Sequence, residues 1–205
     1  MNINQLSGKL WYLSIFLLFV YFVFSLGGYY PSFKVQEKIR QKTIEEIKRI
    51  GFFEPRIDNS SNEKFISTTK RCIDYINLEL RKDQQIPTIL IVAQAIIESN
   101  HGQSRFALEG NNLMGIRIFN STNGMLPLKQ PPSISWRVKT YKTKCESIRD
   151  YINILNNNNF YSKFRQTRLR TKDPIKLAET LENYSTSQTY RTEIVRMITK
   201  IKDKI

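Results

Sequence analysis

The stretch of sequence that most restricts the fold runs from Pro87 to Gly102 and reads PTILIVAQAIIESNHG. A helix over it would be apolar around most of its circumference, and such helices are buried on most sides. Pro87 suits the first turn of a helix, where its missing N–H is harmless, and Gly102 is a residue type that ends helices in the left-handed conformation. The sequence therefore predicts a buried helix with apolar side chains at Ile89, Leu90, Val92, Ala93, Ile96 and Ile97.

One acidic residue, Glu98, falls in the last turn of this predicted helix. Burial disfavours the ionised carboxylate, and so does the negative end of the helix dipole, so we expect the pKa of Glu98 to be raised. A carboxyl group that stays protonated near neutral pH can donate a proton, which is the chemistry that cleavage of a glycosidic bond requires. The alternative is a glutamate that has turned out to solvent at the helix end.

The sequence from residue 60 onward is patterned mainly as helices. Signals for helix starts are two capping boxes and an aspartate before a proline: Ser60 with Glu63, Thr143 with Glu146, and Asp173 with Pro174. An apolar stripe that begins at Tyr190 predicts a last helix. The segments 115–119 and 134–138 flank a stretch rich in Asn, Gly and Pro, which predicts a short β-hairpin. The expected fold class is mainly α, of the α+β type: a helical domain with a small hairpin lobe.

An uncharged run from Leu10 to Phe33 precedes this domain, and Trp11 to Leu26 is dense in large apolar residues. Its length is close to the roughly 20 residues that a bilayer span needs, so we predict a transmembrane helix. A cleaved signal peptide is the alternative, since Lys9 precedes the run and Ser25 and Gly27 are small. The predicted organisation is an N-terminal tail (1–9), a transmembrane anchor (10–30), a stalk (31–59) and a catalytic domain (60–205).

The net charge of +14 indicates an acidic partner. Nucleic acid, anionic lipid and cell-wall polymer all qualify. The sequence has no recognisable helix-turn-helix, zinc or RNA-binding signature, and it carries the apolar run. We therefore expect no nucleic-acid partner.

The chain has only two cysteines and one histidine, so it offers few of the side chains that commonly bind zinc. No Cys and His set has zinc spacing and no Gly-rich loop could cradle phosphates, so we predict no metal, nucleotide or other cofactor. Cys72 lies on the apolar face of a predicted helix, and we expect Cys72 and Cys145 to be buried free thiols. A disulfide between them is the alternative, which the sequence cannot decide.

The segment from Ala93 to Ile116, AQAIIESNHGQSRFALEGNNLMGI, resembles the signature of the bacterial glucosaminidase-domain family. Members of that family read AQA-x-x-ES-x-WG-x-SRFA and then GNN-x-x-G. The resemblance extends through 145–168, which is similar to the Bax-type proteins of the family, and through the closing tyrosine motif and last helix at 181–198. One departure is visible, because His101 stands where many relatives have tryptophan.

The resemblance implies a lysozyme-like fold and a peptidoglycan hydrolase that cleaves after N-acetylglucosamine, with peptidoglycan glycan strands as its substrate. It implies that Glu98 is the general acid and that Tyr184, in the sequence ENYST, orients the substrate's acetamido group. The expected substrate-binding residues are Arg105, Asn111, Asn112, His101, Trp136 and Phe119. Trp136 or Phe119 could stack on a sugar ring or simply pack in the hairpin, and the two asparagines could instead make turn hydrogen bonds.

No Asp or Glu occurs between Gly110 and Cys145. An inverting mechanism with a base in the hairpin is therefore not expected, and the substrate's own 2-acetamido oxygen is the predicted nucleophile. Two alternatives stay open. One is a lytic transglycosylase, which also works with one glutamate, and the other is a catalytically silent module that binds the cell wall.

The charges around the apolar run predict the opposite membrane orientation of the domain to the one that the resemblance implies. Four cations, Lys34, Lys38, Arg40 and Lys42, follow the run, which by the positive-inside rule would place the domain in the cytoplasm. Long domains translocate largely regardless of charge, and the substrate implied by the resemblance lies outside the plasma membrane. We therefore expect a domain anchored in the plasma (inner) membrane of the cell envelope, on its extracytoplasmic or periplasmic side.

Overall fold

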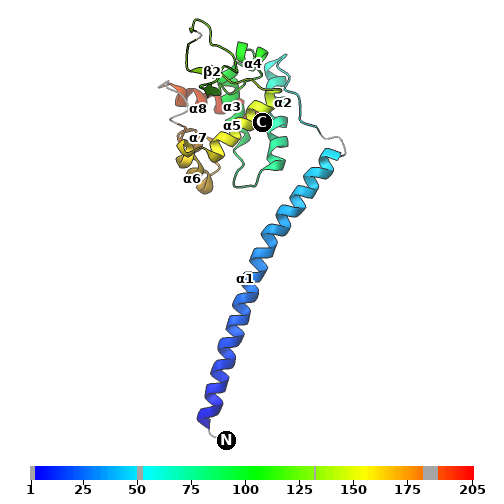
Figure 1. Ribbon diagram of the computed structural model, residues 1–205, viewed down its shortest axis with the longest axis vertical. Coiled ribbons are helices and arrows are strands. Elements are labelled where there is room, and N and C mark those ends of the chain that lie inside the picture. Colours follow the sequence, from blue (N-terminus) through cyan, green and yellow to red (C-terminus); the bar gives the residue numbers. More distant parts are fainter. Residues whose placement is uncertain (1–2, 50–52, 132, 182–188) are drawn as a thin grey trace. The chain divides into compact units, whose positions relative to one another are not determined.

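The computed structural model describes residues 3–49, 53–131, 133–181 and 189–205. The chain divides into two compact units, residues 1–52 and 53–205. The first unit is a single helix of 47 residues, α1 (Ile3–Arg49), drawn in blue in Figure 1. This one helix includes the predicted anchor and the first part of the predicted stalk. Among the described residues, no helix combines the length and the hydropathy needed to cross a membrane.

The second unit is mainly helical and carries one small two-stranded sheet, as predicted. Its elements in chain order are α2 (Asn62–Glu79), α3 (Thr88–Ser99), α4 (Arg105–Glu109), β1 (Arg117–Phe119), β2 (Trp136–Val138), α5 (Lys144–Asn157), the short η1 (Asn159–Tyr161), α6 (Ser162–Arg170), α7 (Pro174–Ala178), α8 (Tyr190–Ile201) and the short η2 (Lys202–Lys204).

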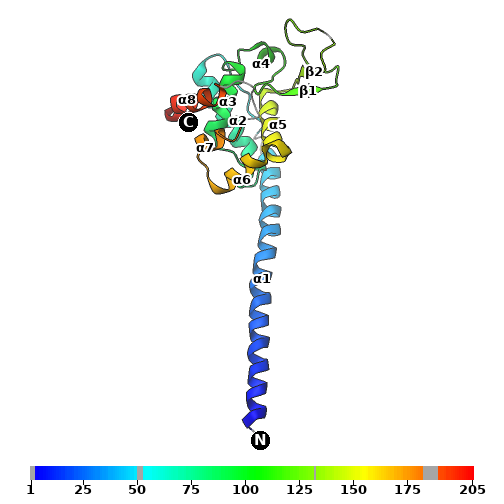
Figure 2. The same cartoon turned by 90° about the vertical axis from the view of Figure 1, so that its left-hand side faces the viewer.

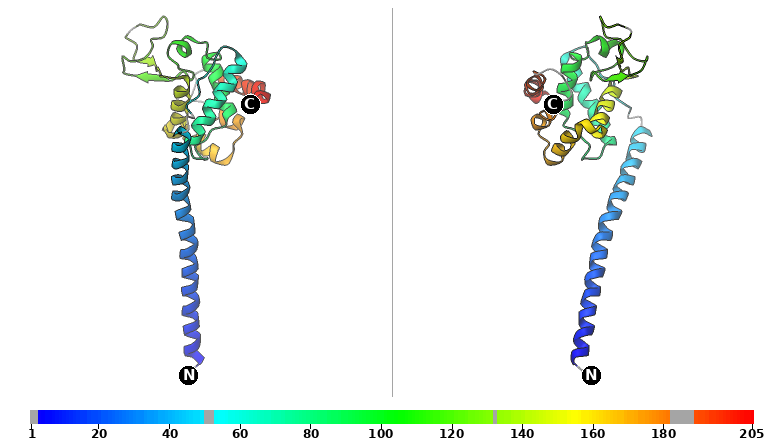
Figure 3. Two further views of the ribbon diagram at one scale, coloured as in Figure 1. Left: turned by 90° about the vertical axis from the view of Figure 1, so that its right-hand side faces the viewer. Right: turned by 60° about the vertical axis from the view of Figure 1, so that its left-hand side comes forward.

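The apolar helix α3 forms the centre of the core, as the sequence predicted. It packs against α2, α7 and α8, and in Figure 3 it lies among the helices of the domain. Its side chains from Leu90 to Ile96 are all buried. The predicted end at Gly102 is wrong, because the helix ends at Ser99 and Asn100 takes the left-handed conformation with φ +49°. Asparagine tolerates this conformation better than most residues, so the glycine was not needed for the cap.

The predicted helix starts are confirmed, with one shift. The side chain of Ser61, not that of Ser60, caps α2 by accepting a hydrogen bond from the amide of Lys64. The Thr143 side chain caps α5. In α7 the N-cap is Asp173, with proline directly after it. These caps satisfy amides that the first helical turn leaves without partners.

The predicted hairpin is confirmed. Strands β1 and β2 pair antiparallel, with Arg117 opposite Val138 and Phe119 opposite Trp136. Because side chains alternate across a strand, these four side chains lie on one face of the hairpin. Figure 2 shows the two strands at one edge of the domain, away from α6 and α7 at the other.

The expectation of two free thiols is wrong. Cys72 of α2 and Cys145 of α5 form a disulfide, with their Cα atoms 5.8 Å apart and the two residues 73 positions apart in the sequence. Both are buried in the core because α2 packs directly on α5. The sequence could not decide this, since it does not reveal which helices become neighbours.

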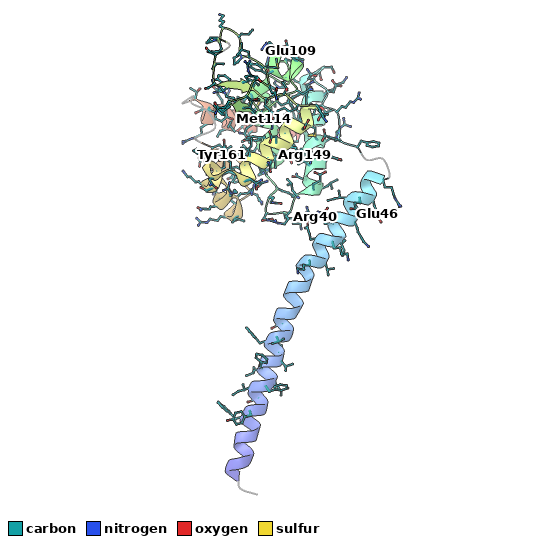
Figure 4. All side chains as sticks on the ribbon, viewed as in Figure 1. Arg40, Glu46, Glu109, Met114, Arg149 and Tyr161 are labelled. Atoms are coloured by element: carbon teal, nitrogen blue, oxygen red, sulfur yellow. A yellow bond between two sulfur atoms is a disulfide. The ribbon has the colours of Figure 1, made fainter. Side chains whose placement is uncertain are left out.

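The segment before α2 packs on the domain from Glu54 onward. Ile57 is buried in the core, and Glu54 forms an ion pair at 3.3 Å with Arg149 of α5, the residue labelled in Figure 4. The same guanidinium also binds Glu79 at the end of α2 and lies over the ring of Tyr75. The last part of the predicted stalk is thus held against α2 and α5.

Candidate active site

Glu98 lies in the last turn of α3, as predicted, and its side chain is partly buried. Burial raises the pKa of its carboxyl group above the usual value, and this is the largest of the influences on it. Removal from water penalises the charged carboxylate, so the protonated form persists to higher pH than in an ordinary glutamate. The carboxyl group is therefore suited to donate a proton.

A chain of buried hydrogen bonds leads to this carboxyl group. The hydroxyl group of Tyr151 donates to Oε1 of Gln94 at 2.7 Å, and Nε2 of Gln94 donates to the hydroxyl oxygen of Tyr190 at 3.2 Å. The Tyr190 hydroxyl in turn hydrogen-bonds to Glu98. This bond lowers the pKa of Glu98 and raises that of Tyr190, as expected when the hydroxyl group donates to the carboxylate. The chain thus holds Glu98 in one orientation and, by stabilising the charged form, lowers its pKa.

The backbone at Gly115 closes against the same carboxyl group. A Cβ atom on Gly115 would lie 3.0 Å from Oε2 of Glu98, and Gly115 has a φ of +65°. Both the space and the left-handed backbone require glycine here. Gly115 is itself exposed, so the backbone that faces this carboxyl group lies at the surface of the domain.

Two charges from different elements act on Glu98. The positive charge of Arg117, on β1, lowers the pKa of Glu98, whereas the negative charge of Glu193, on α8, raises it. Neither outweighs the effect of burial. The acid therefore lies where α3, the hairpin and α8 come together.

The hairpin face that carries Arg117 also carries the two predicted aromatic residues. The guanidinium of Arg117 lies 4.1 Å from the centre of the Trp136 ring, and Phe119 is 65% exposed opposite Trp136. Phe119 is exposed and Trp136 is half-buried, and both rings are of the kind that stacks on sugars, while the cation on the indole fixes its plane.

The side chains of Asn111, Asn112 and Arg105 are engaged with the backbone. Asn112 is 2% exposed; its amide donates to the carbonyls of Ile116 and Lys139 and accepts from two amides of the 112–116 loop. Asn111 donates to the carbonyls of Tyr141 and Lys142, and Arg105 donates to that of Leu126. They therefore shape the loop that carries Gly115 and the hairpin.

His101 lies past the end of α3 with a φ of +56°, and its ring is 5.9 Å from that of Phe65. Partial burial lowers the pKa of His101 below its usual value, and the positive charge of Lys200 lowers it further. The imidazole is therefore neutral at neutral pH. It lines a hollow between α3 and α8 rather than the hairpin side of Glu98.

Residues 75–203, more than half of the chain, match the family model described as mannosyl-glycoprotein endo-beta-N-acetylglucosaminidase. The chain belongs to this glucosaminidase family. Its domain is a glycoside hydrolase, as the resemblance of the 93–116 signature implied. No curated protein sequence matches the chain at a significant level.

Solved structures of glycoside hydrolases share the fold of this glucosaminidase domain. The catalytic domain of the autolysin Auto from Listeria monocytogenes is 22% identical, with a TM-score of 0.54 over 69% of this chain and 84% of that one. A truncated glycoside hydrolase domain of FlgJ from Salmonella typhimurium is 19% identical, with a TM-score of 0.52 over 70% of this chain and 99% of that one. At these identities the likeness shows the fold.

One predicted catalytic residue of the glucosaminidase domain, Tyr184, lies outside the described residues, so its role stays a prediction. Glu146, read as a cap in the sequence, hydrogen-bonds to the amide of Lys142 at the start of α5. Among the described residues, no group of three His, Cys, Asp or Glu side chains could hold a metal ion.

Sequence reasoning assigned no role beside the acid to four residues, Gln94, Gly115, Arg117 and Glu193, although Gly115 is the closing glycine of the GNN-x-x-G signature. It also assigned Tyr190 only to the apolar face of the last helix. Gln94 carried a usable signal, because it is the one polar side chain in a run of apolar residues, and a buried amide requires hydrogen-bond partners. The sequence holds no such signal for Arg117 and Glu193, because nothing in it places β1 and α8 beside α3.

Proposed function

We propose that this protein is a peptidoglycan hydrolase that cleaves the glycosidic bond after N-acetylglucosamine, with Glu98 as the general acid. The observation that carries the proposal is a carboxyl group of raised pKa, held by Tyr190 and acted on by the charge of Arg117, which shares its hairpin face with Trp136 and the exposed Phe119. Membership of the glucosaminidase family supports N-acetylglucosamine as the sugar after which the bond is cleaved. The shared fold with the catalytic domain of an autolysin supports a cell-wall substrate.

In the proposed reaction Glu98 donates its proton to the oxygen of the leaving sugar as the glycosidic bond breaks. The hairpin segment 110–145 has no Asp or Glu that could act as a second carboxylate. The oxygen of the substrate's own 2-acetamido group therefore attacks the anomeric carbon, and water then opens the resulting ring, returning the proton to Glu98. Tyr184 is the proposed orienter of the acetamido group.

We also propose that the domain works outside the cytoplasm while the chain is anchored in the plasma membrane. The disulfide between Cys72 and Cys145 supports this location, because structural disulfides persist in oxidising compartments. The anchor rests on the sequence alone, which has no charge from Leu10 to Phe33.

The decisive experiment compares products of the wild-type chain and Glu98→Gln. The full-length protein in detergent is incubated with purified peptidoglycan, the products are reduced with borohydride, and new ends are identified by mass spectrometry. We expect reduced N-acetylglucosamine ends, and a loss of rate of about 10²- to 10⁴-fold in Glu98→Gln, the usual contribution of a general acid. Glu179→Gln, which neutralises an exposed carboxyl group at the end of α7, is the matched control and should keep full activity.

Other products would reject the proposal. Anhydro-muramic ends would identify a lytic transglycosylase, and full activity in Glu98→Gln would remove the acid from the mechanism. Substrate assistance has its own test, which is peptidoglycan whose glucosamine has lost its acetyl group. The wild-type chain should fail to cut it, and undiminished cleavage would mean that another group attacks the anomeric carbon.

The proposed location is tested with spheroplasts. Protease added outside should degrade residues 53–205, and the remaining fragment should stay with the membrane at high salt and alkaline pH. Protection of the domain until the membrane is lysed would place it on the cytoplasmic side and overturn this part of the proposal.

A further inference from the structure

A hollow of about 490 Å³ lies between the C-terminal end of α3 and the helix α8. We call it the α3–α8 groove. Its floor is apolar, formed by Ile96 and Ile97 of α3 and Met197 of α8. Ile97 directly precedes the proposed acid Glu98, so the floor of the groove adjoins the turn of α3 that carries the acid.

The rim of the α3–α8 groove carries two exposed cations on α8, Arg196 and Lys200. They stand four residues apart on one helix face, where like charges repel. Within the described part of the chain, neither side chain has a hydrogen bond or ion pair with a carboxylate. The one carboxylate on the rim, Glu193, accepts a hydrogen bond from the hydroxyl of Thr189 at 2.8 Å. The two cations are therefore available to an anionic ligand.

His101 shapes the end of the α3–α8 groove. Its imidazole is only partly buried and rests edge-on against Phe65. It occupies the position at which many members of the family have tryptophan. An indole is larger than an imidazole, so the histidine leaves room that a tryptophan would occupy. The groove is thus a feature of this chain's own residues.

We propose that the α3–α8 groove binds the acidic peptide stem of peptidoglycan, with Arg196 and Lys200 contacting a free carboxylate of the stem. This inference rests on the proposed function. The glycan strand itself carries no free charge once its lactyl groups are joined to peptide, whereas the stem carries carboxylates. The apolar floor suits the small apolar side chains of such a peptide, and the position next to the turn of Glu98 suits a chain that branches from a sugar near the scissile bond.

The test is the effect of removing the two cations on substrates with and without stems. Full-length Arg196→Gln/Lys200→Gln is compared with Arg170→Gln/Lys176→Gln, which removes two exposed cations from α6 and α7. The substrates are intact peptidoglycan strands and strands freed of their stems by an amidase, in which the lactyl carboxylates that the amidase exposes are converted to neutral amides. We expect KM for intact strands to rise about three- to tenfold in the groove variant only, since an exposed charge pair contributes only modestly to binding. Its kcat, and its KM for stem-free strands, should not change.

A second measurement uses a ligand that has no glycan strand, so its result does not depend on strand length. Free stem tetrapeptide should inhibit the wild-type chain competitively, and this inhibition should weaken in high salt and in the groove variant. His101→Trp should also raise KM for intact strands, because the indole fills the end of the groove.

Equal KM values for the wild type and the groove variant on intact strands would overturn the inference while leaving the hydrolase in place. So would a rise in KM on both substrates, which would indicate general attraction to an anionic wall. Failure of the wild type to cut either substrate would instead reject the proposed function itself.

Discussion

The hydroxyl group of Tyr190 hydrogen-bonds to the carboxyl group of Glu98, and Gln94 donates to the oxygen of the same hydroxyl group. Glu98 and Gln94 are one turn apart on α3, whereas Tyr190 comes from α8. The last helix of the domain thus takes part in fixing the side chain that ends the central helix. This relationship gives Tyr190 a positioning role in addition to its place in the core.

Tyr190→Phe should change the pH dependence of catalysis. The hydroxyl group stabilises the ionised carboxylate, so its removal raises the pKa of Glu98 above its already raised value. A general acid must be protonated, so activity falls as pH rises through that pKa, and the alkaline limb of kcat/KM should move to higher pH. The profile measured on a soluble glycan substrate checks this. An unchanged limb would mean that the hydroxyl does not act on Glu98.

Arg117→Gln and Glu193→Gln should move the same limb in opposite directions. Loss of the Arg117 charge removes an influence that lowers the pKa of Glu98, so the limb moves to higher pH. Loss of the Glu193 charge removes one that raises it, so the limb moves to lower pH. Both shifts should shrink at high ionic strength, because the two side chains are exposed. Shifts of the same sign would contradict the placement of Glu98 between them.

Gly115→Ala should reduce kcat by at least about tenfold with a modest loss of stability. The added methyl group would lie 3.0 Å from Oε2 of Glu98 and would press on the acid. The left-handed backbone at this position adds a cost of about 1 kcal/mol. Chemical denaturation measures that cost separately from activity. A variant that loses stability but keeps kcat would show that the carboxyl group can move aside.

Removal of the disulfide should destabilise the domain. In the chain-entropy model a crosslink that closes a loop of 73 residues contributes about 4 kcal/mol. Cys72→Ala/Cys145→Ala should therefore lower the free energy of unfolding by about 2–4 kcal/mol. Because both cysteines are buried, reductant should act on the wild type only once it unfolds, and it should not affect the double variant. Equal stability of the two proteins would contradict a constraint by this crosslink.

Much of the helical domain could be predicted from the sequence, because helices are specified by local patterns. The caps at Thr143 and Asp173 and the apolar run before Glu98 depend on residues within a few positions of one another. The same holds for the alternation that predicted the hairpin. Where local signals competed, as between Ser60 and Ser61, the prediction missed by one residue, since either hydroxyl could have served as the cap.

Some features of the candidate site could likewise be predicted from the sequence, and others are visible only in the structure. The sequence by itself determined that a carboxyl group ends a buried helix, which is enough to predict the raised pKa of Glu98. It also determined, through its signature, the family of the domain. It did not reveal that Asn112 is consumed in shaping the loop before the hairpin, because its partners Ile116 and Lys139 meet only after the hairpin folds.

Only the tertiary structure decided what surrounds the acid. Tyr190 reaches Glu98 because α8 packs along α3, and the charge of Arg117 acts on it because the fold places Gly115, just before β1, against the same carboxyl group. The disulfide was decided in the same way, by the packing of α2 on α5. Contacts between residues tens of positions apart depend on the burial of whole apolar faces, and the order in which those faces meet is a property of the folded chain, not of any segment of its sequence.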